Sequence, residues 1–173
     1  MPQLLLLRHA KSSWDDPKLP DHSRPLNARG KYAANHLGQI LRQIGAMPDR
    51  VLVSSARRTL QTLEQLEPWP VVPAIEVQDN LYLASARSML DLINEVPADT
   101  RRLLVVGHNP GMHELALLLL SGVAGVEHQK LAESFPTTAL AWFEFSGNWD
   151  QLREGTASLL RFILPADAAD PGL

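Results

Sequence analysis

The sequence predicts an α/β fold, a single three-layer α/β/α domain around a mostly parallel central sheet of about six strands. Three observations predict it. Short apolar runs alternate with segments in which apolar residues recur at helical spacing. The strongest of these runs hold no polar residue, as expected of parallel strands buried on both faces. The chain has 173 residues, 45% hydrophobic and 20% charged, which suits one soluble domain with a sizeable core.

In the first part of the chain, the consecutive leucines at residues 4–7 predict a strand. A polar loop follows, and Asn27 then has the residue type of a helix N-cap. Apolar residues recur at helical spacing from there to Gly45, which is a typical C-cap. Residues 50–55 predict a second strand, and residues 56–66 predict a second helix.

The middle and the end of the chain continue the alternation. Residues 74–77, after a proline-rich turn, predict a third strand. Ser85 is the expected cap of a helix that ends near Val96. Two further strands are expected at residues 138–145 and 158–164, joined by a loop that contains glycine.

The segment 102–111 is the clearest unit in the sequence. An apolar strand runs into a turn, after which Asn109 is the predicted N-cap of a helix and Pro110 its first residue. This helix is expected to continue through residue 120.

Composition limits the surroundings and the partners. The net charge of −3 argues against broad nucleic-acid binding, which needs a basic surface. The absence of cysteine excludes disulfides and thiolate metal sites, and it suits a reducing compartment. No apolar run is long enough for a membrane span or an export signal. We therefore expect a cytoplasmic protein without a membrane partner, whose one domain spans residues 1–165 and whose tail, residues 166–173, is frayed. Its oligomeric state stays open.

Charged, nucleophilic or hydrogen-bonding side chains follow three of the predicted strands. These are Arg8 and His9 after the first strand, Ser54, Ser55, Arg57 and Arg58 after the second, and His108 and Asn109 after the fourth. Ligands of such sheets bind beyond the carboxyl ends of the strands, so these groups are expected to converge. The helix N-termini that follow would add positive potential.

Taken singly, these residues have ordinary structural explanations. An arginine at a strand end can pair with a surface carboxylate, and a histidine there can be a hydrogen-bonded boundary residue. Structural needs alone rarely gather so much positive potential without matching acid, however. The ligand that fits is a dianionic phosphoryl group, held by arginines while one histidine attacks phosphorus.

Four segments in series carry a resemblance to a known family. They are "LRHAKSSW", "RPLNARG", "VLVSSARRTLQT" and "VVGHNPG", and together they span about residues 3 to 145. The chain resembles the histidine phosphatase superfamily, the phosphoglycerate-mutase-like enzymes with an Arg-His-Gly motif. It is most similar to their short branch of phosphohistidine phosphatases. The resemblance implies the phosphoglycerate-mutase-like fold and a phosphatase that needs no cofactor.

The resemblance also assigns roles to residues. It makes His9 the phospho-acceptor, Arg8 its phosphate-binding neighbour and His108 the second catalytic histidine. In the family's second motif the catalytic arginine stands four positions after a serine and is followed by Gln-Thr. Counting from Ser54 gives Arg58 rather than Arg57. Further substrate contacts are expected from a second group of residues, namely Arg24, Ser54, Asn109 and Trp14.

The sequence departs from the family pattern at two positions, and the second departure bears on the substrate. Ala10 replaces the common glycine. Larger members carry an acidic residue after the third strand as general acid, and the position aligned to it is Asn80, with Asp79 adjacent. A missing acid favours phosphohistidine, with a protein as its expected carrier, because imidazole is a better leaving group than an alkoxide. Two alternatives stay open: a small-molecule phosphomonoesterase or mutase with Asp79 as acid, and a non-catalytic phosphate-binding adaptor.

A metal site is not expected. We interpret the loop that contains Asp15, Asp16, Asp21 and His22 as a solvated rim near the substrate. His108 and His113 lack the spacing of a helical zinc pair.

Overall fold

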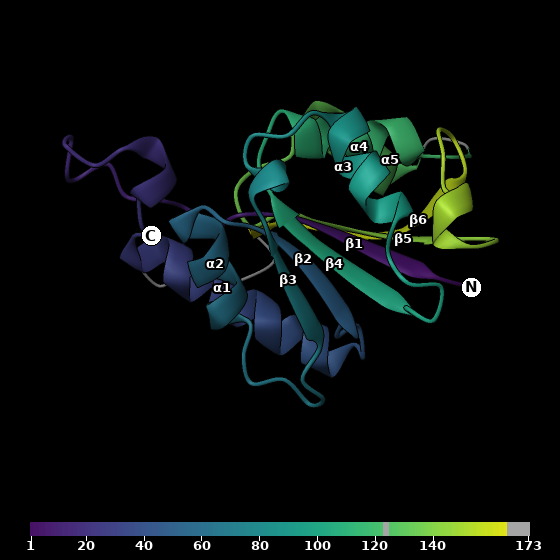
Figure 1. The fold of residues 1–173 in the computed structure, drawn as a ribbon, viewed down its shortest axis with the longest axis horizontal. Helices are drawn as coiled ribbons and strands as arrows, with labels where there is room; N and C mark the ends of the chain where they lie inside the picture. The colour runs from purple at the N-terminus through teal and green to yellow at the C-terminus, as the bar shows by residue number, and fades with distance from the viewer. Residues whose placement is uncertain (123–124, 166–173) are drawn as a thin grey trace.

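A six-stranded mixed sheet forms the middle of the protein in the computed structural model, which describes residues 1–122 and 125–165 (Figure 1). The strands are β1 (Gln3–Arg8), β2 (Arg50–Ser54), β3 (Ala74–Gln78), β4 (Arg102–Gly107), β5 (Leu140–Phe145) and β6 (Ala157–Ile163). The α-helices are α1 (Ala28–Gln43), α2 (Arg57–Gln65), α3 (Ala86–Asn94), α4 (Gly111–Leu119) and α5 (Val126–Glu133). Short 3-10 helices are η1 (Asp21–Ser23), η2 (Asp79–Leu81) and η3 (Trp149–Gln151).

The strand order is β3-β2-β4-β1-β5-β6, and the fold class predicted from the sequence is confirmed. Four strands, β3, β2, β4 and β1, run parallel, while β5 pairs antiparallel with β1 and β6 pairs antiparallel with β5. Because β4 lies between β1 and β2, the carboxyl ends of these three strands are neighbours. The residues that follow them therefore emerge side by side at one edge of the sheet.

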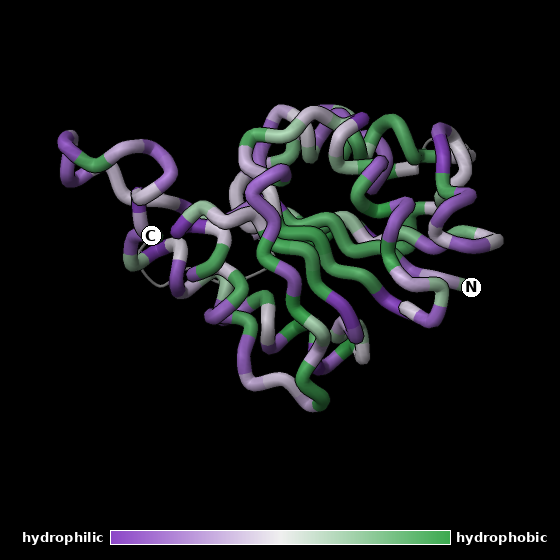
Figure 2. The backbone as a smooth tube through the Cα atoms, in the orientation of Figure 1, coloured by the Kyte–Doolittle hydropathy of each residue, from purple (hydrophilic) through white to green (hydrophobic). Residues whose placement is uncertain are grey.

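Alternation along β1 divides the core into two layers. Leu4 and Leu6 pack with residues of α3, α4 and α5, whereas Leu5 and Leu7 pack with residues of α1 and α2. Figure 1 shows these two groups of helices on opposite faces of the sheet, and Figure 2 shows the strands as the apolar centre. Since β1 is packed on both faces, the residues at its carboxyl end have a fixed position.

The predicted caps of two helices are present. The side chain of Asn27 accepts a hydrogen bond from the N–H of Gly30 at the start of α1. Ser85 does the same for the N–H of Ser88 at the start of α3. Gly45 follows the last cap residue of α1 with a φ of 69°, which glycine adopts without strain.

The start of α4 differs from the prediction by one residue. Pro110 is the N-cap, and the helix begins at Gly111. Asn109 still caps the helix from one position further out, because its side-chain oxygen accepts a hydrogen bond from the N–H of His113 at 3.2 Å. Its amide also donates to the carbonyl of Phe135 at 2.8 Å, and this contact holds Asn109 outside the helix.

Helix α5 was not predicted. Its buried residue is Leu131. One buried position does not produce the apolar repeat by which an amphipathic helix is predicted from sequence. The predicted frayed tail, residues 166–173, lies outside the described residues. Within the part of the chain that the structure describes, no helix combines the length and the apolar character that a membrane span requires.

Candidate active site

A pocket of about 340 Å³ opens beyond the carboxyl ends of β1 and β4. Its lining residues are Arg8, His9, Lys11, Ser12, Trp14, Arg24, Arg58, Leu83, His108, Asn109 and Thr137. Of the residues assigned to the site from the sequence, all but Ser54 line this pocket. No aspartate or glutamate is among these lining residues. The pocket is therefore cationic, although the chain as a whole has a net charge of −3.

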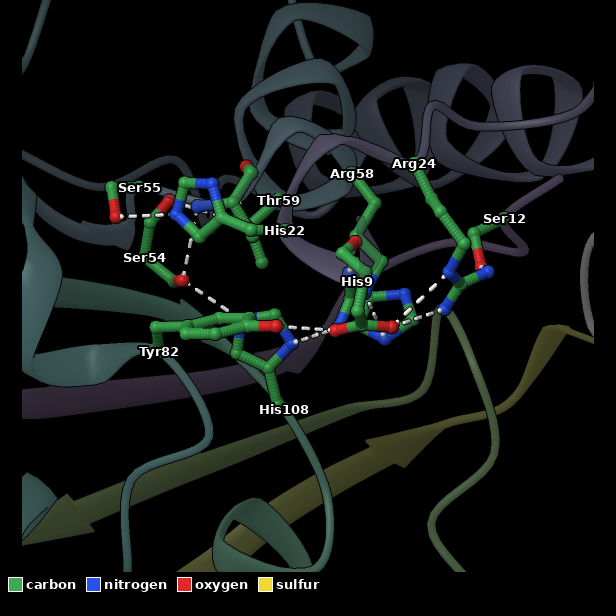
Figure 3. Close-up of polar contacts among 12 residues, drawn as sticks. His9, Ser12, His22, Arg24, Ser54, Ser55, Arg58, Thr59, Tyr82 and His108 are labelled. Carbon is green, nitrogen blue, oxygen red and sulfur yellow. Dashed lines mark hydrogen bonds and ion pairs between the residues drawn. The ribbon is translucent and has the colours of Figure 1, made fainter. Parts of the chain in front are cut away.

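His9 follows β1 directly and is buried. Its Nδ1 lies 2.7 Å from the carbonyl oxygen of Ala10. Its Nε2 lies 3.3 Å from Nε of Arg58, and Figure 3 shows these two side chains together. A carbonyl only accepts, so Nδ1 carries the proton, and the lone pair on Nε2 of the neutral ring accepts the hydrogen bond from Nε of Arg58. Burial, with the charges of Arg58 and Arg8, lowers the pKa of His9 to about 4. The ring is therefore neutral near pH 7.

His108 follows β4 and faces the same guanidinium. Its Nε2 lies 2.8 Å from Oγ of Ser54, and its Nδ1 lies 3.3 Å from a terminal nitrogen of Arg58. A guanidinium only donates, so Nδ1 accepts and Nε2 donates to the serine. Burial, with His9 and Arg58 nearby, lowers the pKa of His108 to about 3. The two histidine rings lie 5.3 Å apart, centroid to centroid, and both are neutral near pH 7.

The structure separates the two arginines at the start of α2. Arg57 is exposed, whereas Arg58 is only 3% exposed and lines the pocket. Arg58 donates to both histidines and also to the backbone carbonyl of Asp21, at 2.8 Å. A buried cation is costly unless it is paired, and the carboxylate of Asp21, 3.0 Å away, supplies the opposite charge.

Asp21 is the acidic group at the edge of the site. Its carboxylate accepts hydrogen bonds from Arg58, from Arg24 at 3.1 Å and from the hydroxyl of Tyr82. These bonds, that of Tyr82 first, lower the pKa of Asp21 to about 2, so it remains a carboxylate. The sequence predicted it only as part of a solvated rim near the substrate. Its contacts join residues far apart along the chain, and no local pattern marks them.

Arg24 holds the loop between β1 and α1 together. Its guanidinium donates to Oγ of Ser12 at 2.7 Å and to the carbonyl of Ser13 at 3.2 Å, besides its bonds to Asp21. The ring of Trp14 stacks on this guanidinium, with 3.5 Å between the central carbon and the ring centroid. Most N–H groups of Arg24 thus have partners in its own loop, and a phosphate contact from it stays a prediction.

Arg8 offers a donor that lacks a partner. One terminal nitrogen donates to the carbonyl of Phe135 at 3.2 Å. Its Nε is buried, and the described part of the chain gives it no hydrogen-bond partner. Burial and the charge of Arg58 lower the pKa of Arg8. An unpaired buried N–H is unfavourable, and an oxyanion is the acceptor that a guanidinium binds best.

Three positions singled out from the sequence lie away from the pocket lining. Ser54 is fully buried and contacts His108, so its place is that of a residue that orients this ring rather than one that touches substrate. Asp79 and Asn80, the two candidates for the position of the general acid, are exposed in η2. Neither is among the residues that line the pocket.

Two threonines hold the chain around His9, a role that was not predicted for either of them from the sequence. Thr138 has a φ of 65°, unusual for a β-branched residue, and its N–H donates to the carbonyls of Arg8 and His9, each at 3.1 Å. The Oγ1 of Thr62 accepts the N–H of Ala10 at 2.9 Å. Neither contact leaves a trace in residue spacing, because each depends on the path of the backbone.

Comparisons with known proteins agree with this geometry. Residues 4–81 match the profile of the histidine phosphatase superfamily, branch 1. An uncharacterized protein of Mycobacterium tuberculosis is 35% identical over 161 residues, which cover 92% of this chain and 99% of that protein. An uncharacterized chloroplastic protein of Arabidopsis thaliana is 34% identical over 130 residues, covering 68% of this chain and 58% of that protein.

Solved structures show the same similarity over nearly the whole chain. The putative phosphohistidine phosphatase SixA from Nakamurella multipartitia superposes with a TM-score of 0.84 at 29% identity, covering 95% of this chain and 96% of that chain. The putative phosphohistidine phosphatase SixA from Agrobacterium tumefaciens gives a TM-score of 0.78 at 28% identity, covering 95% of this chain and 99% of that chain. The chain therefore belongs to the histidine phosphatase superfamily and is one of its phosphatases.

Proposed function

We propose that this phosphatase hydrolyses phosphohistidine on a partner protein, without a metal ion, through a covalent phosphohistidine on His9. The state of His9 is the observation that supports this most. Its ring is neutral, its proton is held on Nδ1 by the carbonyl of Ala10, and its Nε2 lone pair lies beside Arg58. Such a nitrogen is a nucleophile near pH 7 without a base to deprotonate it.

The reaction has two displacements at phosphorus. Nε2 of His9 forms a bond to phosphorus while the P–N bond of the substrate breaks, and that electron pair stays on the departing imidazole. Water then attacks phosphorus, the bond to His9 breaks with its electron pair returning to Nε2, and a proton of the water leaves with the solvent. Arg8 and Arg58 balance the charge on the phosphoryl oxygens. His108 accepts a hydrogen bond from Arg58 on Nδ1 and thereby orients this guanidinium beside the phosphoryl group.

The leaving group decides between substrates. An alkoxide needs a proton as it departs, but no carboxyl group is among the lining residues, and Asp21 is held ionised by its partners. Asp79, the acid of the alternative phosphomonoesterase, is exposed outside the lining. An imidazole that is protonated on its other nitrogen leaves as a neutral molecule and needs no acid. The pocket therefore favours a P–N bond over an alkyl ester.

A comparison of leaving groups tests the proposal. We expect phosphohistidine and an activated aryl phosphate to be hydrolysed with a kcat/KM about 10²-fold or more above that of phosphoserine, the usual scale of general-acid help. Asp79→Asn should leave the rate on phosphohistidine unchanged. Equal rates on phosphoserine, or loss of activity in Asp79→Asn, would instead establish a phosphomonoesterase that uses this acid.

A further inference from the structure

The pocket has an apolar part that phosphoryl transfer does not use. Among its lining residues, Trp14 and Leu83 are the large hydrophobic ones. Trp14 is 74% exposed and Leu83 is 54% exposed. They come from different segments, the loop after β1 and the turn after η2. Exposed apolar side chains beside convergent polar groups are typical of a surface that a ligand covers.

The backbone places Leu83 at the pocket against its own preference. Its φ is 51°, which aliphatic residues rarely adopt. The preceding Tyr82 is held by Asp21. The carbonyl of the following Ala84 packs on Gly111 so closely that a Cβ there would lie 2.0 Å from it. A conformation that is enforced from both sides at the edge of a site points to a role in that site.

Trp14 is held in place as well. Its ring lies on the guanidinium of Arg24, which is itself fixed by Asp21 and Ser12. This stack fixes the orientation of the ring while leaving most of its surface free. The aromatic surface beside the pocket is therefore preorganised, and a ligand that packs on it would not have to order it.

We propose that Trp14 and Leu83 recognise the ring that carries the phosphoryl group. They form an apolar wall against which the imidazole of phosphohistidine packs while its phosphoryl oxygens face Arg8 and Arg58. This inference rests on the proposed function. A flat aromatic ring suits the face of a tryptophan, and neither an amine nor an alkyl chain offers one. A pocket of about 340 Å³ is near the lower end of ligand sites, roughly 300–1,000 Å³, so it takes one side chain with its phosphoryl group.

Two substrates with a P–N bond separate ring recognition from chemistry: a phosphohistidine peptide, and phosphoramidate, which has no ring. Trp14→Ala and Leu83→Gly remove the wall, and glycine also accepts the positive φ of Leu83 without strain. Each should lower kcat/KM for the peptide about tenfold, mainly through KM, and leave phosphoramidate unchanged. Trp14→Phe should keep most of the wild-type preference. Val72→Ala is the matched control, since Val72 is an apolar residue 75% exposed outside the pocket lining.

The outcomes distinguish the two proposals. Equal losses on both substrates would mean that Trp14 and Leu83 only maintain the pocket, and no loss on either would mean that they do not touch substrate. Each result overturns the inference while leaving phosphohistidine as the substrate. A wild type that hydrolyses phosphoramidate but not the phosphohistidine peptide would overturn the proposed function, and the inference with it.

Discussion

The two ends of the parallel strands differ in how completely their charges are paired. At the amino end lies a groove of about 1160 Å³, lined by residues that include Gln3, Asp49 and Arg102. The carboxylate of Asp49 accepts the N–H groups of Arg101 and Arg102. The guanidinium of Arg102 donates to Gln3 and to two backbone carbonyls. The charged side chains of Asp49 and Arg102 in this amino-end groove therefore have partners within the protein.

The pocket at the carboxyl end is smaller, at about 340 Å³, and its hydrogen bonding is less complete. It holds two histidines whose pKa values are lowered to about 4 and about 3. It also holds the unpaired Nε of Arg8 and the strained backbone of Leu83. The difference teaches that unfinished hydrogen bonding and histidines held neutral by burial, rather than size, indicate where the chemistry is. Substitutions at the pocket should therefore change activity, and those at the groove should change stability or nothing.

The largest expected effect is that of His9→Ala. Removing the nucleophile should lower kcat/KM to background, because neither His108 nor Arg58 replaces it. The melting temperature should change little, since an imidazole at the pocket edge contributes little to the core. Val71→Ala, in the lining of the amino-end groove, is the control and should keep the wild-type rate. A His9→Ala enzyme that retains a substantial fraction of the rate would show that another group attacks phosphorus.

A pair of aspartate variants sharpens the comparison. Asp21→Asn removes the charge that pairs with Arg58, so we expect kcat/KM to fall about 10–100-fold. Stability should fall as well, because the buried guanidinium of Arg58 then lacks its opposite charge. Asp49→Asn replaces one of the two carboxylate oxygens by an NH2 group, so one of two backbone N–H groups loses its acceptor. It should cost about 1–2 kcal/mol of unfolding free energy at unchanged kcat/KM. Urea denaturation and steady-state kinetics check both variants. Equal changes in unfolding free energy and in kcat/KM for the two variants would mean that the two ends of the strands do not differ in this way.

Acid should destabilise the protein through the pocket. His9 and His108 have pKa values of about 4 and about 3 when folded, against an ordinary value of 6.5, so the unfolded chain binds protons first. Their contribution to stability is complete above pH 6.5 and is lost as the pH falls through the folded values. The loss is on the order of several kcal/mol for the pair.

Denaturation curves between pH 7 and pH 4 measure this loss. His9→Gln should flatten the dependence, because it removes one of the two titrating rings. No histidine is among the residues that line the amino-end groove, so substitutions there should leave the slope unchanged. Constant stability across this range would mean that the histidines are not held neutral in the folded protein.

The smallest expected effect is that of metal removal, which should leave the activity unchanged. Positive charge at the pocket comes from arginines, and the described residues contain no group of three or more metal-ligating side chains. Activity should survive EDTA undiminished. A loss that zinc or magnesium restores would move the reaction toward the acidic loop at residues 15–22.

The fold was predictable where packing leaves a pattern. The apolar run of β1 and the caps Asn27 and Ser85 follow from residue type and spacing. Helix α5 buries Leu131 and shows no such period. At the start of α4, the tie from Asn109 to Phe135 moves the cap by one position, and no local sequence shows that tie.

The site was predictable where reactive residues end neighbouring strands. His9, Arg58 and His108 could be placed together because parallel strands bring their carboxyl ends to one edge. The contacts of Asp21, expected only in a solvated rim near the substrate, and the place of Leu83 could not be predicted. The partners of Asp21 lie on α2 and beside η2, and the conformation of Leu83 depends on how its neighbours pack. Such contacts appear only once the chain is folded.

Trapping the phosphorylated enzyme tests the central claim most directly. The wild-type protein, quenched during turnover of a labelled substrate, should carry label that is stable to alkali and labile to acid, as a phosphoramidate is. Peptide mapping and NMR should place the phosphoryl group on Nε2 of His9, because Nδ1 is occupied by the carbonyl of Ala10. Label on a serine such as Ser55, on a carboxylate such as Asp21, or on no residue during steady turnover would contradict attack by His9.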